Sequence, residues 1–408
     1  MIGSGSFKIQ TMSKAGNRAA ILECISTAEE IARVDIAQAT GINAATVTAL
    51  TSELLDEGIV EALMDEEKQN TKRGRPRVKL CLNPKAFNLA GAKISEDAIT
   101  VAIIDFAGTL LSEHMQKGNS FAIPKHKLAA NLKKAISVAV DKAGLHIDDI
   151  TALGVGIPGY VDIASECVHW SPALSDTPTN FVETLRATFD FPVMLDNDVN
   201  LAALAEQRFG LGKGISDFLV VTIEHGVGMG IVLNNNLFRG TRGLGGEFGH
   251  TKVQLNGALC RCGQRGCLEA YVADYALLRE ADTAIKLQSA NNLPTAQRLE
   301  ALYLEAKSGN QAALSIFERA GKIFGMGLAN LVNIFDPSLI IFAGERMQFD
   351  FLYEEDVLEE LRRNTLQIDR APPKVQVHKW GDLLWAKGAA AWATEYVIHQ
   401  AAAKNNES

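Results

Sequence analysis

Apolar positions in residues 18–54 recur every three or four residues, which is the period of an amphipathic helix. The pattern predicts a helix over 18–28, a short second helix, and a third helix that Asn43 caps; Gly41 supplies the turn between the last two. The expected core positions are Ile21, Leu22, Ile25, Ile36, Val47, Leu50 and Leu54. This order is typical of a helix-turn-helix, although a generic helical hairpin has the same pattern.

The residues that the third helix would expose are small. Such side chains allow close approach to base edges, and the methyl groups of alanine and threonine can contact thymine. The predicted base-contacting face consists of Ala44, Ala45, Thr46 and Thr48, followed by Ser52.

Residues 57–83 predict a strand, a polar turn and a second strand, which together form a wing. Basic residues gather in and after the turn: Lys68, Lys72, Arg73, Arg75, Arg77 and Lys79. Within them, Arg73-Gly74-Arg75-Pro76 resembles a minor-groove hook, in which proline keeps the chain extended and arginine enters a narrow groove. A solvated charge run is the alternative. Because this basic segment directly follows a helix-turn-helix, we favour DNA contact through Arg73 and Arg75.

From residue 87 the pattern changes to short apolar runs that alternate with amphipathic helices, which indicates an α/β fold. A long helix ends before Pro337, because proline cannot continue a helix. The predicted strands lie at 88–94, 99–105, 150–158, 192–198, 220–233 and 338–345, and helices at 127–143, from 199 and at 320–336.

Composition places limits on the class of protein. A chain of 408 residues with 47% hydrophobic and 22% charged residues suits a soluble protein of two to four domains. The net charge of −8 gives no overall attraction to nucleic acid, so any DNA contact must come from a local basic patch. Without a long apolar run or an apolar signal segment, we expect a cytoplasmic protein, and the scattered Cys24, Cys81 and Cys167 agree with a reducing compartment.

Residues 243–269 gather candidate metal ligands in the pattern H-x9-C-x-C-x4-C. One imidazole and three thiolates form a four-ligand set suited to tetrahedral structural zinc: His250, Cys260, Cys262 and Cys267. A glycine-rich loop with unmetallated thiols is the alternative. A metal ion here would also fix two carboxylates, Glu247 and Glu269, on neighbouring backbone, and carboxylates fixed in this way suit hydroxyl-rich ligands.

Four motifs in order, GVGIPGYVD, LDNDVNLAALAE, GGEFGH and CxCGxxGCLE, resemble the ROK family of bacterial sugar kinases and repressors over roughly residues 88–395. With the winged head in front, the whole chain resembles the repressor branch. The resemblance implies a two-lobed actin-like ATPase (sugar-kinase-like) body behind a winged helix-turn-helix, with sugar bound between the lobes and zinc supporting the sugar-binding loop. The sugar ligands it implies are Asn197, Asp198, Glu247, His250 and Glu269.

In kinases of this family, Asp198 would be the general base, and glycine-rich turns would hold ATP phosphates. Here the base position is retained, whereas the turns read 93–97 (KISED), 224–226 (EHG) and 343–345 (AGE). Carboxylates in these turns would repel phosphate, and side chains larger than glycine would keep the backbone from approaching it closely. We therefore expect no kinase activity. His225 is interpreted as a structural histidine at a strand end.

We therefore expect a homodimeric, sugar-responsive repressor of carbohydrate uptake or catabolism, with operator DNA and a sugar or sugar phosphate as partners. The expected domains are the arm and head at 1–86, a first lobe at 87–200 completed by a helix at about 383–403, and a second lobe at 201–382 with the zinc motif and dimerisation helices. Two alternatives stay open: an active sugar kinase with a DNA-binding head, and an Mlc-type repressor that a membrane sugar transporter sequesters.

Overall fold

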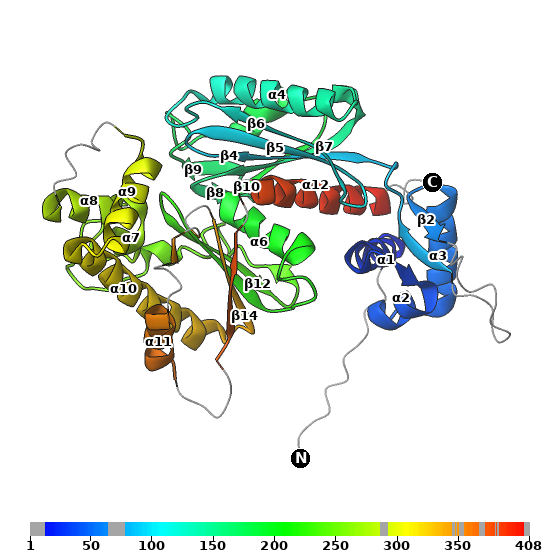
Figure 1. The fold of residues 1–408 in the computed structure, drawn as a ribbon. Coiled ribbons are helices and arrows are strands. Elements are labelled where there is room, and N and C mark those ends of the chain that lie inside the picture. The colour runs from blue at the N-terminus through cyan, green and yellow to red at the C-terminus, as the bar shows by residue number, and fades with distance from the viewer. Residues whose placement is uncertain are drawn as a thin grey trace, which may run out of the picture.

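The computed structural model describes residues 13–63, 78–285, 293–344, 347, 349–350, 355–366, 372–379, 381 and 383–403. Two five-stranded sheets form a body, and a small helical head lies at one end of it (Figure 1). No helix among the described residues is long and apolar enough to cross a membrane. The fold expected from the sequence, a winged head before a two-lobed body, is confirmed.

The head contains α1 (Lys14–Ala28), α2 (Arg33–Thr40) and α3 (Ala44–Asp56), and a small sheet in the order β1-β3-β2. The Asn43 side chain accepts a hydrogen bond of 2.8 Å from the Thr46 amide and so caps α3, as predicted. The strands are β1 (Ile31–Ala32), β2 (Val60–Leu63) and β3 (Lys79–Leu82), and the antiparallel β2–β3 pair forms the wing. Residues 64–77 between β2 and β3, including Arg73 and Arg75, lie outside the described residues.

The first sheet of the body has the order β10-β7-β4-β5-β6. Strands β10, β7 and β4 run parallel, whereas β5 and β6 continue the sheet in antiparallel pairs. Helix α4 (Lys125–Lys142) covers one face, and the strands are β4 (Asn88–Ile94), β5 (Ala98–Asp105), β6 (Leu110–Lys117), β7 (Ile150–Ile157) and β10 (Val193–Asn197). A hairpin of β8 (Tyr160–Asp162) and β9 (Cys167–Trp170), followed by α5 (Phe181–Arg186), lies between β7 and β10 in the chain.

The second sheet has the order β13-β12-β11-β14-β15, and its central strands are fully buried. Its strands are β11 (Phe218–Ile223), β12 (Val227–Leu233), β13 (Asn236–Leu237), β14 (Leu339–Ala343) and β15 (Lys374–His378). The helices beside it are α7 (Glu269–Val272), α8 (Asp274–Ala284), α9 (Thr295–Lys307), α10 (Gln311–Phe335) and α11 (Glu355–Asn364).

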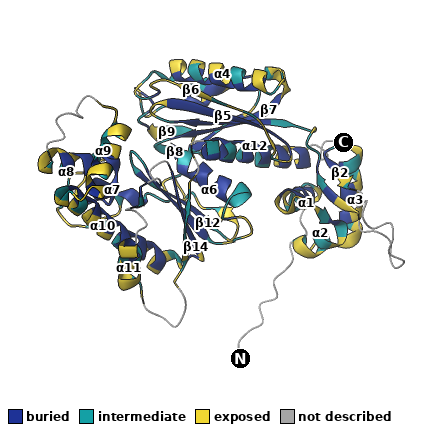
Figure 2. Cartoon of the chain, viewed as in Figure 1, coloured by how far each residue is buried: buried dark blue, intermediate teal, exposed yellow. Residues whose placement is uncertain are grey.

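Helices α6 (Asp198–Phe209) and α12 (Leu383–Ala403) join the parts of the molecule. Helix α6 packs against strands of both sheets and against α12, which covers the face of the first sheet opposite α4 (Figure 1). Figure 2 shows α12 buried along most of its length. Gly91 of β4 permits this packing, because a Cβ there would lie only 2.0 Å from the Ala386 carbonyl oxygen. The division of the chain at residues 86, 200 and 382 stays a prediction.

Candidate functional site

A cavity of about 570 Å³ lies where the two sheets meet, and all five residues expected to bind sugar line it. Asn197 ends β10 and Asp198 begins α6, while Glu269 begins α7. Glu247 and His250 come from the loop after β13. Residues more than 70 positions apart in sequence are therefore brought to one cavity.

The carboxylates of the cavity lie close enough to affect one another. Burial raises the pKa of Glu247 to about 7, and the negative charges of Glu269 and Asp198 add to the rise. Glu269 is fixed by its neighbours: its Oε2 accepts from the Val227 amide at 3.3 Å, and its Oε1 accepts from the Tyr275 hydroxyl at 3.3 Å and lies 3.6 Å from the Cys260 sulfur. A carboxylate fixed in this way is a suitable acceptor for ligand hydroxyls.

Asn197 already uses both ends of its amide within the protein. Its Nδ2 donates to the Gly159 carbonyl at 2.8 Å, and its Oδ1 accepts from the Val199 amide at 2.9 Å, which caps α6. One Nδ2 hydrogen remains for a ligand. Trp170, 48% exposed, lines the same cavity with its ring centroid 5.5 Å from that of Tyr160, so two aromatic faces border the polar groups.

His250, Cys260, Cys262 and Cys267 offer ligand atoms that all lie within 4.8 Å of one another. The Cys262 and Cys267 sulfurs are 3.7 Å apart, and the Cys260 sulfur is 3.7 Å from His250 Nδ1. A tetrahedral zinc ion at ordinary bond lengths requires edges of roughly 3.8 Å between sulfurs and about 3.6 Å between sulfur and nitrogen. The residues present therefore fit a zinc ion, with Nδ1 as the histidine ligand.

Glycines let the loop pass close to its neighbours. Gly243 has φ +71°, and a Cβ there would lie 2.2 Å from the Val161 carbonyl oxygen of β8. Gly266, with φ +79°, would place a Cβ 1.9 Å from the Gln254 carbonyl oxygen. Both positions require glycine for backbone angle and for space, which explains the glycine-rich sequence around the metal ligands.

Two of the turns expected to hold phosphates in a kinase, at 93–97 and 224–226, contribute residues to the lining of the cavity, whereas Glu345 of the third lies outside the described residues. Lys93 was expected in the first turn, but it lies within β4. Its side chain is only 2% exposed, and its Nζ lies 3.4 Å from Glu224 Oε2. His225 was interpreted as a structural histidine at a strand end; it lies in the turn between β11 and β12, with Nε2 3.0 Å from Glu96 Oε2. The Glu224 carboxylate is thus next to a buried cation, which the sequence did not indicate.

Three of the predicted base-contacting residues, Ala44, Ala45 and Thr48, are exposed on α3, and Thr46 is half-buried. The Thr48 hydroxyl donates to the Ala44 carbonyl at 2.8 Å, within its own helix. Small side chains therefore form an open surface on the second helix of the helix-turn-helix.

Comparison with known proteins identifies both parts of the chain. The ROK family model matches residues 89–396, and a winged helix-turn-helix DNA-binding model matches residues 17–61. The chain belongs to the ROK family. A xylose repressor of Caldicellulosiruptor bescii is 30% identical over 93% of this chain and 96% of its own.

Solved structures of the ROK family show the same fold. A ROK transcriptional regulator, described as a homologue of the E. coli MLC protein, matches 95% of this chain and 98% of its own with a TM-score of 0.78 and 22% identity. A ROK hexokinase from Thermus thermophilus matches 76% of this chain and 99% of its own with a TM-score of 0.65 and 30% identity. The regulator match covers the head as well as the body.

In this ROK protein the head is connected directly to the cavity-lining helix. Helix α6 begins at Asp198 in the cavity, and near its other end Arg208 donates to the Ser26 hydroxyl of α1. Lys213, just after α6, pairs with Glu29 at 2.5 Å. Apolar side chains of the head and of α12, including Ile25 and Ile398, share one continuous core.

Sequence reasoning missed several residues of the site. Tyr160 was not among the predicted residues, yet its hydroxyl lies 2.8 Å from Nε2 of His250. Lys252 Nζ lies 2.9 Å from the Cys267 sulfur. Tyr160 belongs to the GVGIPGYVD motif and Lys252 follows His250 by two positions, so motif position was the available signal for both.

Proposed function

We propose that the chain is a DNA-binding transcriptional repressor of genes for carbohydrate uptake or catabolism, and that a sugar in the cavity sets its affinity for operator DNA. The observation that carries the proposal is the helix α6, which runs from the cavity to a winged helix-turn-helix head. The similarity to a xylose repressor over almost the whole chain supports the sugar-related targets.

The chemistry of the cavity supports a sugar as the ligand. The cavity is lined by the hydrogen-bonding side chains of Asn197, Asp198, Glu247, His250 and Glu269, and Tyr160 and Trp170 add aromatic surface. A site that pairs buried polar groups with ligand hydroxyls rejects ligands that lack them, because its own groups would remain without partners.

One zinc ion held by His250, Cys260, Cys262 and Cys267 would stabilise this part of the site. When bound, the ion would supply cross-links within the loop that carries Glu247 and the start of α7 that carries Glu269. Tyr160 would orient the His250 ring through its hydroxyl, and Tyr275 holds Glu269.

Coupling between sugar and DNA would pass through α6 and α12. A ligand that displaces Asp198 moves α6, and the Arg208–Ser26 and Lys213–Glu29 contacts transmit the movement to α1 of the head. Two heads in a homodimer would read two half-sites, so a change in their spacing alters affinity for DNA. The change in operator affinity can be no larger than the difference in sugar affinity between the two arrangements of the heads.

Selection of duplex DNA from a random-sequence library with the full chain tests the proposal. We expect a two-fold symmetric site, whose affinity, measured by fluorescence anisotropy at fixed salt with zinc present, changes about tenfold with at least one neutral or phosphorylated sugar. Asp198→Asn keeps the size of the side chain and removes its charge, so the sugar concentration needed for half of the effect on DNA affinity should rise roughly tenfold or more.

Failure to select any DNA would refute the repressor. Selection of a site that no sugar affects would refute the sugar sensor and favour control by a membrane sugar transporter.

A second candidate function, a sugar kinase with a DNA-binding head, is favoured by the retained Asp198 and by the 30% identity with a hexokinase. Against it, Glu96, Glu224 and His225 lie in the turns that would hold ATP phosphates, where Glu224 pairs with Lys93 of β4 and Glu96 contacts His225. A coupled assay for ADP release with hexoses and pentoses distinguishes the two; we expect no turnover above background.

A further inference from the structure

Two close contacts, an ion pair and a carboxylate–imidazole contact, cross the cavity from the first sheet to the second. Lys93 of β4 reaches Glu224 after β11 at 3.4 Å, and Glu96 of the β4–β5 turn reaches His225 at 3.0 Å. We refer to these two contacts as the cross-cavity pairs. Asp274 lies 3.8 Å from the other ring nitrogen of His225, so a further carboxylate stands behind the second pair.

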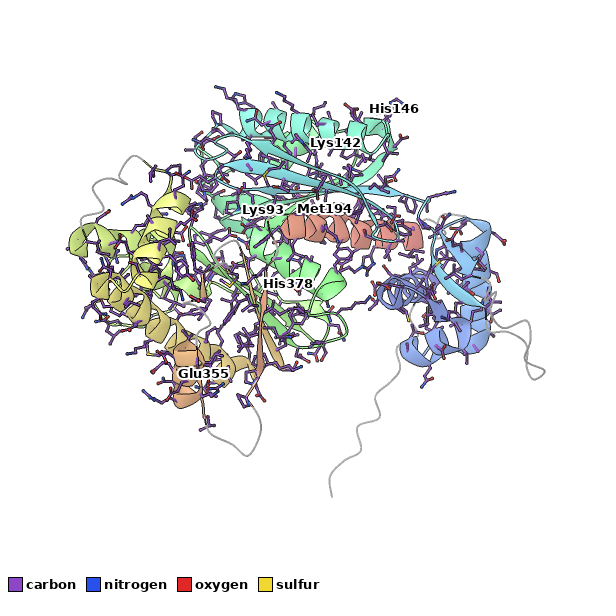
Figure 3. All side chains as sticks on the ribbon, in the orientation of Figure 1. Lys93, Lys142, His146, Met194, Glu355 and His378 are labelled. Carbon is purple, nitrogen blue, oxygen red and sulfur yellow. The ribbon has the colours of Figure 1, made fainter. Side chains whose placement is uncertain are left out.

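Lys93 is held on a second side as well. Its Nζ lies 4.0 Å from the centre of the Trp385 ring at the start of α12, and Figure 3 places Lys93 beside that end of the helix. Gly344 at the end of β14 approaches the same carboxylate, because a Cβ on Gly344 would lie 3.1 Å from Glu224 Oε1. This end of the cavity is therefore occupied by mutually paired protein groups.

Negative charge dominates the cavity lining. The carboxylates are Glu96, Asp198, Glu224, Glu247 and Glu269, whereas the permanent cations are Lys93 and Arg261. Lys93 is paired with Glu224, and the Arg261 guanidinium stacks on Tyr275 at 4.1 Å from the ring centre. Both cations are thus already engaged by protein groups.

We propose that the cavity selects a neutral, unphosphorylated sugar, and that Glu224 and Glu96, through the cross-cavity pairs, are the residues that exclude phosphorylated sugars. This inference rests on the proposed sugar sensor and defines the class of its ligand. A phosphate group carries nearly two negative charges, so it would have to displace Glu224 from Lys93 or Glu96 from His225 and then lie among the remaining carboxylates. A neutral sugar meets hydrogen-bonding groups without this repulsion.

The inference predicts a gain of binding on substitution. Glu224→Gln removes the carboxylate that holds Lys93 and leaves a cation at this end of the cavity, so affinity for a phosphorylated sugar should rise by roughly tenfold or more. Glu96→Gln, on an exposed turn, should give a smaller rise of the same sign. Glu113→Gln, an exposed position of β6 away from the cavity, is the matched control and should change nothing.

The experiment measures thermal stability of the zinc-containing full chain with D-xylose, D-glucose and N-acetyl-D-glucosamine, and with their phosphates at equal concentration. A ligand that binds the folded state raises the melting temperature. We expect at least one neutral sugar, and no phosphorylated sugar, to stabilise the natural chain. Titration of each variant with these sugars then gives its relative affinities.

Stabilisation of the natural chain by a phosphorylated sugar more than by its neutral form would overturn the inference and leave the sugar sensor standing. Variants that gain no affinity for phosphorylated sugars, while still responding to the neutral sugar, would overturn the role of Glu224 and Glu96. If no sugar of either class stabilises the chain, the sensor itself is wrong, and the inference fails with it.

Discussion

Replacement of Cys262 by serine tests the metal cluster and its effect on the second sheet. Cys262 is exposed and serine has nearly the same shape, so the substitution itself should alter the stability of the metal-free chain by less than about 0.5 kcal/mol. Its cost lies in the lost metal ligand. The Cys167→Ser variant removes a thiol far from the cluster in sequence and serves as the control.

The size of the effect follows from mass action. An ion present at a thousand times its dissociation constant stabilises the folded state by about 4 kcal/mol. For a folding unit of 150–250 residues, 1 kcal/mol corresponds to roughly 2–4 °C, so loss of the ion should lower the melting temperature by about 8–16 °C. The four ligand atoms lie within 4.8 Å of one another, so little reorganisation opposes binding of the ion.

The assay combines metal analysis of the purified chain with thermal unfolding before and after chelation. The natural chain and Cys167→Ser should contain one zinc ion and lose stability with chelator, whereas Cys262→Ser should contain less zinc and respond weakly to chelator. A natural chain that contains no metal after growth with zinc, or whose melting temperature chelator leaves unchanged, would refute the zinc site.

Three further predictions concern the head, the body and their contact. Arg75→Ala should weaken DNA binding, chiefly at sites with A·T-rich flanks, as measured by anisotropy at matched salt; equal affinity would exclude the hook. Gly91→Ala should destabilise the chain by about 1–3 kcal/mol in urea unfolding, because its Cβ would meet α12, whereas Gly381→Ala has open space and should be neutral. Ser26→Ala leaves an Arg208 donor without its partner, so the head should dock about 1–3 kcal/mol more weakly, and the sugar effect on DNA affinity should shrink.

Elements with strong local signals were predictable from sequence. The α3 helix begins where Asn43 caps it, and α10 ends at Phe335, before Pro337, because these residues fix backbone conformation locally. The metal ligands lie within one short segment, so their spacing alone indicated a cluster, which the structure brings together.

Contacts between distant segments were not predictable from local pattern. Lys93 and Glu224 are 131 residues apart, and only the packing of the two sheets brings them together. The sequence indicated carboxylates that would repel phosphate, whereas the fold places the buried cation of Lys93 beside one of them, Glu224. Similarly, Tyr160 is 90 residues from His250, so its role as the imidazole partner depended on the position of the β8–β9 hairpin.

The position of α12 at residues 383–403 affects the order in which the protein can be assembled during synthesis. A ribosome releases the head, the first sheet and the second sheet before this helix, yet α12 covers the first sheet and supplies part of the core beneath α1. The head therefore cannot reach its docked arrangement until translation has passed nearly every other element. A chain truncated before residue 383 would carry a DNA-reading head that the rest of the molecule does not hold in place.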